Sequence, residues 1–412
     1  MKVVGLITEY NPFHNGHRYH IQRAKEITGA DYAVVIMSGN YVQRGTPAIM
    51  PKRLRAEMAL QCGADAVFEF PLCYSTGSAE FFAEGAVSFL HQLNIVDFLC
   101  FGSESDNLSG LQKIADILVE EPDEYRLSLQ KHLKNGLSFP CARQIALNEC
   151  IQDFSLTTLL DDPNNILGIE YLKALKKLNS PIQPFTILRK GAHYHSEDLD
   201  ESFSSASAIR SQFTSCEEFS AIESRLSGQV PDECILLMKE NYQTLYPVMP
   251  NDFSLLLKYR LLEETPESLV QYVDVSEELA NRIYHRLPDF LNFDQFCELL
   301  KTKEMTYTRI QRALLHVLLK LTKNDLKVQL EHGHYYARLL GFRIESVAII
   351  SAISKNSSLP LITKLSQIES LNGLGQQILR KDIFASNLYS SVVEQKYGLI
   401  QKAEYQYPVL KV

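Results

Sequence analysis

The 412-residue sequence lacks any apolar run approaching the roughly 20 residues that a membrane-spanning helix needs. The apolar stretch near its first residue is too short for a secretory signal, and no small-residue cleavage site follows it. Its eight cysteines form no C-x-x-C pair, which disfavours a disulfide framework and a zinc site. We therefore expect a cytoplasmic protein with no membrane segment and with free thiols.

Two common nucleotide-binding motifs are also missing. The chain has neither a G-x-x-x-x-G-K-[ST] loop nor a complete G-x-G-x-x-G, so a P-loop kinase and a dinucleotide enzyme lack support. The formal net charge is −8, which argues against indiscriminate nucleic-acid binding. The H-x-H pairs at 193–195 and 332–334 have no cysteines nearby, and we expect no metal held by protein ligands.

Charge is nevertheless unevenly distributed. The segment 301–345 carries nine Lys and Arg against four Asp and Glu, a net +5. Within it, Tyr307 opens an amphipathic helix that places Arg309 and Arg312 on one face. Tyrosine and arginine together suit an RNA backbone or a stacked base, although an ordinary solvated face remains an alternative.

Strand-like and helix-like segments alternate through the first two hundred residues. We expect strands at 3–7, 31–37, 66–70, 98–101 and 184–189, and helices at 16–28, 52–62, 78–93, 110–133, 143–152 and 165–178. This alternation predicts an α/β fold, with a parallel sheet covered by helices on both faces.

The pattern changes after about residue 217. Helical spacing is found at 255–264, 277–287, 293–300 and 308–321, and a strand is expected at 346–350. We therefore expect two domains, an α/β catalytic domain over 1–215 and a mostly helical domain with a mixed C-terminal portion over 216–412.

The run E-Y-N-P-F-H-N-G-H, from Glu9 to His17, directly follows the first expected strand and opens a helix. Gly16 lets the backbone approach a phosphate closely, and the helix start supplies free N–H groups. His14 and His17 can donate hydrogen bonds to phosphate oxygens on which charge develops during nucleotidyl transfer. The motif predicts a nucleotide site with these two histidines as its catalytic residues.

A second candidate motif is the serine-rich run from Ser204 to Arg210, which precedes a short helical pattern. Its hydroxyls and backbone N–H groups can cap the helix and cradle a triphosphate, with Arg210 as counter-charge. An ordinary helix cap is the alternative.

Both motifs resemble those of the nucleotidylyltransferase superfamily, namely H-x-G-H and I-S-S-T-x-I-R. The synthetase K-M-S-K-S loop is absent, which disfavours an ordinary aminoacyl-tRNA synthetase. The runs 39–45, 55–60, 101–104 and 163–168 resemble the bacterial tRNA(Met) cytidine acetate ligase family, and the similarity covers essentially the whole chain. This resemblance implies a Rossmann-like nucleotidylyltransferase domain. It also implies that ATP, accompanied by Mg²⁺, and acetate form acetyl-adenylate, and that N4 of the wobble cytidine of elongator tRNA(Met) receives the acetyl group.

The resemblance also implies which residues form the site. ATP contacts are expected at Ile7, Thr8, Glu9, Tyr10, Asn11, Pro12, Phe13, His14, Asn15, Gly16, His17, Arg18, Tyr19, His20, Gly102, Asn165, Arg189, Ser205, Ser207 and Arg210. A turn glycine, a helix cap and a surface charge are the plainer readings of Gly102, Asn165 and Arg189. We expect tRNA contacts at Arg309 and Arg312, and we interpret Lys52 and Arg55 as solvated helix charges rather than phosphate ligands.

Two other functions remain open from the sequence. A small-molecule nucleotidylyltransferase would share every N-terminal feature, but it leaves the basic helical segment unexplained. An inactive RNA-binding relative would keep the fold, yet the presence of both histidines and of the serine-rich turn argues against it.

Overall fold

The computed structural model describes residues 1–137, 139–151, 156, 158–189, 205–214 and 218–412. One sheet has the strand order β10-β8-β5-β2-β1-β6-β7, with β9 pairing with β8. Its strands are β1 (Val3–Thr8), β2 (Tyr32–Ser38), β5 (Ala66–Phe70), β6 (Phe98–Ser103), β7 (Gln183–Leu188), β8 (Ala337–Phe342), β9 (Leu361–Ile362) and β10 (Leu410–Lys411). The five strands of the first half run parallel, and β8 is antiparallel to β5. The expected parallel sheet is confirmed.

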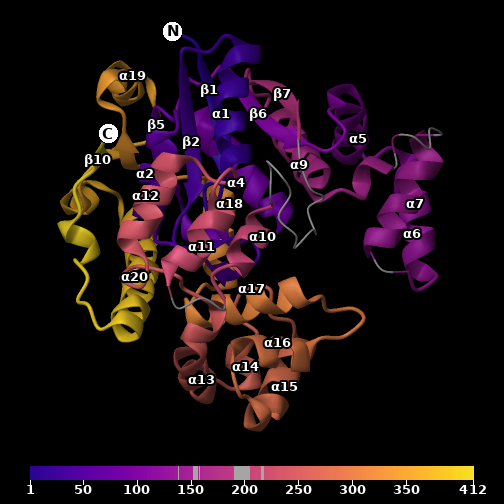
Figure 1. Ribbon diagram of the computed structural model, residues 1–412. Helices are drawn as coiled ribbons and strands as arrows, with labels where there is room; N and C mark the ends of the chain where they lie inside the picture. Colours follow the sequence, from indigo (N-terminus) through magenta and orange to yellow (C-terminus); the bar gives the residue numbers. More distant parts are fainter. Residues whose placement is uncertain (138, 152–155, 157, 190–204, 215–217) are drawn as a thin grey trace.

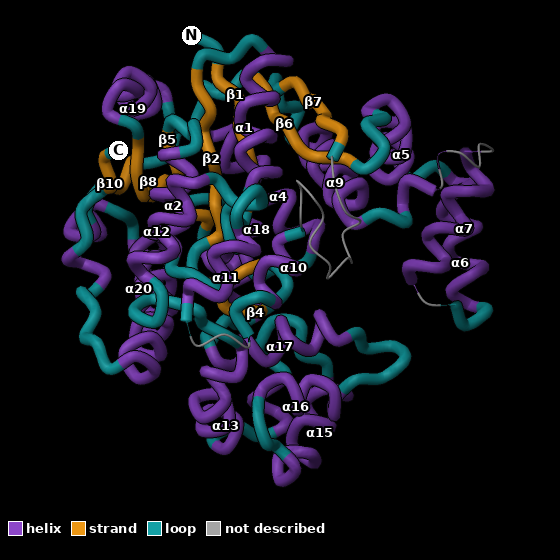
Figure 2. Tube along the Cα trace, in the orientation of Figure 1, coloured by secondary structure: helices purple, strands orange, loops and turns teal. Residues whose placement is uncertain are grey.

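The central strands are apolar on both faces because helices cover both faces (Figure 2). In β2, Val34 and Ile36 join one apolar cluster, and Ala33 and Val35 join the other. The first face is covered by α4 (Ala79–Gln92) and α9 (Pro163–Lys177), and the second by α1 (Asn15–Thr28) and α2 (Lys52–Gln61).

Helices account for most of the remaining structure (Figure 1). They are α3 (Leu72–Ser75), α5 (Leu108–Glu120), α6 (Asp123–Lys134), α7 (Phe139–Ile151), α10 (Ala206–Ser211), α11 (Phe219–Leu226), α12 (Asp232–Asn241), α13 (Ser254–Leu262), α14 (Pro266–Leu269), α15 (Glu277–Arg286), α16 (Phe293–Leu300), α17 (Tyr307–Leu318), α18 (Lys323–His332), α19 (Val347–Asn356) and α20 (Gly373–Tyr397). Helix α17 lies between the α13–α16 group and the sheet-containing part. No described helix is long and apolar enough to cross a membrane.

Two expected elements were wrong. The strand expected at 346–350 belongs to helix α19, where Ile349 and Ile353 are buried four residues apart and Val347 is exposed. That spacing is helical, so the β-branched run was misleading. The single helix expected at 110–133 is two helices, because Pro122 stands between α5 and α6 and cannot continue the first.

The sheet takes strands from both sides of residue 215, since β8 and β10 extend it beyond β5. The expected division into domains over residues 1–215 and 216–412 stays a prediction. Helices α13–α16 form the part of the second half that stands apart from the sheet, with α17 between the two (Figure 1).

Candidate active site

The candidate site lies at the carboxyl end of β1. The chain builds β2 and β5 on one side of β1 and then crosses to β6 on the other, so β1 borders a switch in strand order. Ligands of open α/β sheets bind at such a switch. The loop after β1 reaches α1, whose first turn carries His14 as N-cap and His17.

The two imidazoles are oriented by backbone groups. The Gly16 N–H donates to His14 Nδ1 at 3.1 Å, and the His14 N–H lies 3.3 Å from His17 Nδ1. Because each Nδ1 is an acceptor, the neutral ring carries its proton on Nε2. The rings stack with their centroids 3.7 Å apart. Each histidine therefore offers an Nε2–H donor.

Their surroundings keep these imidazoles neutral. Burial, reinforced by the positive charges of Arg189 and Arg210, lowers the pKa of His14 to about 3. Burial, with His14 and Arg189 as lesser causes, also lowers the pKa of His17 well below its ordinary value. His14 is buried in the structure rather than exposed on the turn. A neutral pair donates hydrogen bonds without exchanging protons near pH 7.

The serine-rich turn faces this loop. Ser205 caps α10 by accepting from the Ala208 N–H at 3.0 Å. Arg210 donates to Ser207 Oγ at 2.9 Å and to the Asn11 carbonyl at 2.7 Å, joining the turn to the loop before α1. The two motifs, almost two hundred residues apart in sequence, therefore form one site; Ser204 lies outside the described residues.

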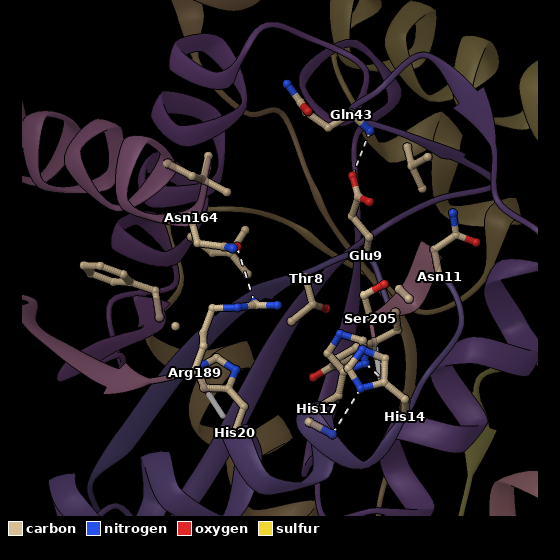
Figure 3. A pocket seen from close by; sticks show the side chains of 18 of the residues that line it. Thr8, Glu9, Asn11, His14, His17, His20, Gln43, Asn164, Arg189 and Ser205 are labelled. Carbon is tan, nitrogen blue, oxygen red and sulfur yellow. Dashed lines mark hydrogen bonds between the residues drawn. The ribbon is translucent and has the colours of Figure 1, made fainter. Parts of the chain in front are cut away.

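A cavity of about 290 Å³ opens between these elements, and Figure 3 shows the side chains of some of the residues that line it. Most of the expected ATP contacts border it: Ile7, Thr8, Glu9, Tyr10, Asn11, His14, Gly16, His17, Tyr19, His20, Gly102, Arg189, Ser205, Ser207 and Arg210. At Gly102 a Cβ atom would stand 3.2 Å from Arg189 Cγ, so the glycine lets these two positions approach each other.

Five expected contacts do not border the cavity. Phe13 is buried in the core with Pro12 beside it, and Asn15 and Arg18 face the other way, toward Gly228 and Glu233. Asn165 is fully buried and accepts from Ser103 Oγ at 2.6 Å. Its neighbour Asn164 lines the cavity instead, because consecutive residues of a helix point about 100° apart.

A hairpin that the sequence analysis did not assign to the site forms part of the wall. Strands β3 (Tyr41–Val42) and β4 (Thr46–Pro47) pair, and Gln43 and Arg44 at their turn line the cavity. The Gln43 N–H donates to Glu9 Oε1 at 2.9 Å (Figure 3). The glycine-containing turn in the run 39–45 was the one local signal of this hairpin.

Neither Lys52 nor Arg55 is a solvated helix charge. Lys52 is buried against Glu69 and Glu404, with Nζ–Oε1 distances of 2.6 and 2.7 Å. Arg55 is fully buried and donates to backbone carbonyls of residues 9, 38, 39 and 50. Arg55 therefore fixes the loops after β1 and β2, whereas Lys52 ties α2 to β5 and to the C-terminal part of the chain. The helical pattern of α2 gave no sign of either role.

The expected RNA-facing residues lie on α17, away from the cavity. Arg309 is exposed, whereas Arg312 is half-buried and its Nε lies 2.9 Å from Asp274 Oδ2. Arg338, which contributes to the +5 count, is buried in ion pairs with Glu69 and Glu404. The basic surface of the segment is therefore smaller than its sequence suggests.

This fold and this site define a class of protein. A mostly parallel sheet with an H-x-G-H turn after its first strand is the arrangement of a nucleotidyl transferase, and the family model described as HIGH Nucleotidyl Transferase matches residues 1–404.

Curated relatives and solved structures narrow the class. The chain is 42% identical over 414 residues to the tRNA(Met) cytidine acetate ligase of Thermoanaerobacter sp. (strain X514), with 100% of both chains covered. It is 42% identical over 393 residues to that of Acetivibrio thermocellus, with 94% of each covered. Crystal structures of Thermotoga maritima TmcAL match over 100% of both chains, the apo form with a TM-score of 0.93 at 32% identity and the form bound with alpha-thio ATP with 0.91 at 31%. The chain belongs to the tRNA(Met) cytidine acetate ligase family.

Proposed function

We propose that this protein is an ATP-dependent ligase that activates acetate as acetyl-adenylate. It then transfers the acetyl group to N4 of the wobble cytidine of elongator tRNA(Met). The observation that carries the first step is the pair of neutral imidazoles, both with Nδ1 engaged by backbone N–H groups. The names of the relatives, at 42% identity over the full length, support the choice of acetate and tRNA.

In the first step an acetate oxygen attacks the α-phosphorus of ATP. The bond from that phosphorus to the bridging oxygen breaks, and pyrophosphate leaves. Acetate is ionised at neutral pH, so no general base is required, and the obstacle is repulsion between two anions. His14 and His17 donate to the oxygens on which charge develops, and Arg210 offsets the negative charge at the serine-rich turn.

Magnesium would enter this site with ATP. No group of three His, Cys, Asp or Glu side chains in the described part of the chain is placed to hold an ion. Mg²⁺ is commonly held by one or two carboxylates together with substrate phosphates, and Glu104, whose carboxylate accepts from the cavity-lining Asn164, would supply one. When bound, the ion would neutralise charge on the leaving pyrophosphate.

We place the tRNA on the side of the molecule that carries α17. Arg309 is exposed there at the start of the helix, and the hairpin at 41–47 separates this helix from the cavity. Phosphate contacts from such arginines position an RNA without reading its sequence. Arg312 is paired with Asp274, so it helps to shape this surface but offers little unpaired positive charge to the tRNA.

Incubation with ATP and labelled acetate, with and without tRNA, tests the assignment. We expect acetate-dependent pyrophosphate release without tRNA, and AMP together with acetylated cytidine when tRNA is added. A small-molecule nucleotidylyltransferase would leave the tRNA unmodified, and an inactive RNA-binding relative would bind tRNA without consuming ATP.

A further inference from the structure

One carboxylate stands in the cavity that also holds the histidines, the arginines and the serine-rich turn. Glu9 follows β1, is half-buried and borders the cavity. The Gln43 N–H holds its Oε1 at 2.9 Å, and no other side chain of the described residues pairs with its second oxygen. In Figure 3 the Glu9 carboxylate points toward Gln43 and away from His14 and His17.

The imidazoles of His14 and His17, which can donate to a triphosphate, lie apart from the Glu9 carboxylate in Figure 3. Arg210 and the serine-rich turn line the same cavity. A carboxylate is repelled by a polyphosphate, so the end of the cavity near Glu9 suits a different group. That group should donate hydrogen bonds.

We propose that Glu9 binds the exocyclic amino group of the cytidine and accepts its proton during acetyl transfer. This inference rests on the proposed function. The N4 amino group of cytosine is a hydrogen-bond donor, and Glu or Asp is its usual side-chain acceptor. Its lone pair is delocalised into the ring, so removing a proton as the new bond forms assists a weak nucleophile.

N4 attacks the acetyl carbonyl carbon, the bond from that carbon to the phosphate oxygen breaks, and AMP leaves with the bonding electrons. One N4 proton passes to a carboxylate oxygen of Glu9 and from there to water. The remaining N4–H stays on the amide product.

The hairpin that holds Glu9 also borders the proposed RNA side. Gly45 at its turn has φ +82°, and a Cβ there would stand 2.4 Å from the backbone nitrogen of Arg312 in α17. The hairpin is thus packed between α17 and the cavity, with Glu9 bonded to its inner side. The part of the cavity near Glu9 therefore borders the hairpin that contacts α17.

Glu9→Gln tests the proposal, because glutamine keeps the length and the acceptor for Gln43 but cannot take a proton. We expect acetate-dependent exchange of pyrophosphate into ATP, measured without tRNA, to stay within about three-fold of wild type, whereas single-turnover acetylation of tRNA falls about 10²–10⁴-fold. Glu26→Gln, an exposed carboxylate on α1, is the matched control and should change neither rate.

Two results would overturn the proposal. A parallel loss of exchange would assign Glu9 to ATP or its magnesium, and unchanged acetylation would remove it from the transfer step. Glu9→Asp provides a second check. If Glu9 accepts a proton, the aspartate variant should acetylate tRNA faster than the glutamine variant. If Glu9 makes only a spatial contact, the glutamine variant should be the faster of the two. If wild type performs neither reaction, the proposed function fails instead.

Discussion

At the scale of the residue, the account depends on two histidines that act as neutral hydrogen-bond donors. His14→Asn and His17→Ala should each lower acetate-dependent pyrophosphate exchange about 10²–10³-fold, since each removes one preorganised donor. Asparagine is chosen at position 14 because it can replace His14 as the N-cap of α1. Circular dichroism and thermal unfolding verify the fold, and near-normal exchange in a folded double variant would disprove the catalytic assignment.

The low histidine pKa values make a prediction about pH. The folded protein keeps His14 unprotonated down to a pKa of about 3, against an ordinary value of 6.5. The exchange rate should therefore show no histidine inflection between about pH 6 and 7. Because the unfolded chain binds protons that the folded one does not, the free energy of unfolding should decrease as pH falls below 6.5 toward 3. An exchange rate that follows a titration near pH 6.5 would mean that a charged imidazole takes part.

Arg210 joins the two halves of the nucleotide site through Ser207 and the Asn11 carbonyl. Arg210→Ala should raise the dissociation constant of ATP about ten-fold, the usual effect of losing a charge-assisted hydrogen bond. Arg23→Ala, which removes an exposed arginine paired with Glu26 on α1, should leave ATP affinity unchanged. Equal affinities of the two variants in an ATP titration would exclude a role for Arg210. Lys52 cannot serve as the control, because it is buried in ion pairs.

At the scale of the element, the hairpin at 41–47 requires a glycine where it meets α17. Gly45→Ala meets both a positive φ and a clash with the backbone of Arg312, whereas Gly29→Ala meets a positive φ of 62° and open space. Denaturant unfolding should show Gly45→Ala less stable than Gly29→Ala by about 1–3 kcal/mol, the usual cost of overpacking. Equal losses would mean that the hairpin does not press on α17.

Elements with strong periodicity could be predicted from sequence, and contacts between distant elements could not. The buried run of β2 and the helix start at the H-x-G-H turn are local signals, and the structure has the expected strand and helix there. The roles of His14 and His17 stay a prediction. Nothing local indicates that Gln43 folds over Glu9, because that contact depends on how the β3–β4 hairpin packs. Whether Asn164 or Asn165 faces the cavity depends on the rotation of α9 about its axis. The sequence gives the start of this helix only to within a residue or so, and that is too coarse to determine the rotation.

At the scale of the whole molecule, RNA binding and adenylate formation should be separable. Arg309→Glu reverses an exposed charge on α17 without breaking the Arg312–Asp274 ion pair. It should weaken tRNA binding and reduce the slope of affinity against salt by about one, because fewer counterions are released. Pyrophosphate exchange without tRNA should be unchanged.

Lys355→Glu, an exposed reversal on α19, is the matched control for tRNA affinity. If both charge-reversal variants bind tRNA equally more weakly than wild type, the effect comes from the overall charge of the protein and α17 is not the docking surface. Loss of exchange in Arg309→Glu would instead show that the part around α17 and the cavity do not act separately.

The central claim, that acetate is activated by attack on the α-phosphate, is tested most directly with oxygen-18. Acetate labelled in both carboxylate oxygens should transfer one labelled oxygen to AMP, because the acetate oxygen that bonds to the α-phosphorus stays there when N4 displaces AMP. Mass spectrometry of the AMP released during tRNA acetylation measures this transfer. We therefore expect the released AMP to carry one labelled oxygen. Unlabelled AMP, or label appearing in phosphate or pyrophosphate, would contradict an acetyl-adenylate intermediate.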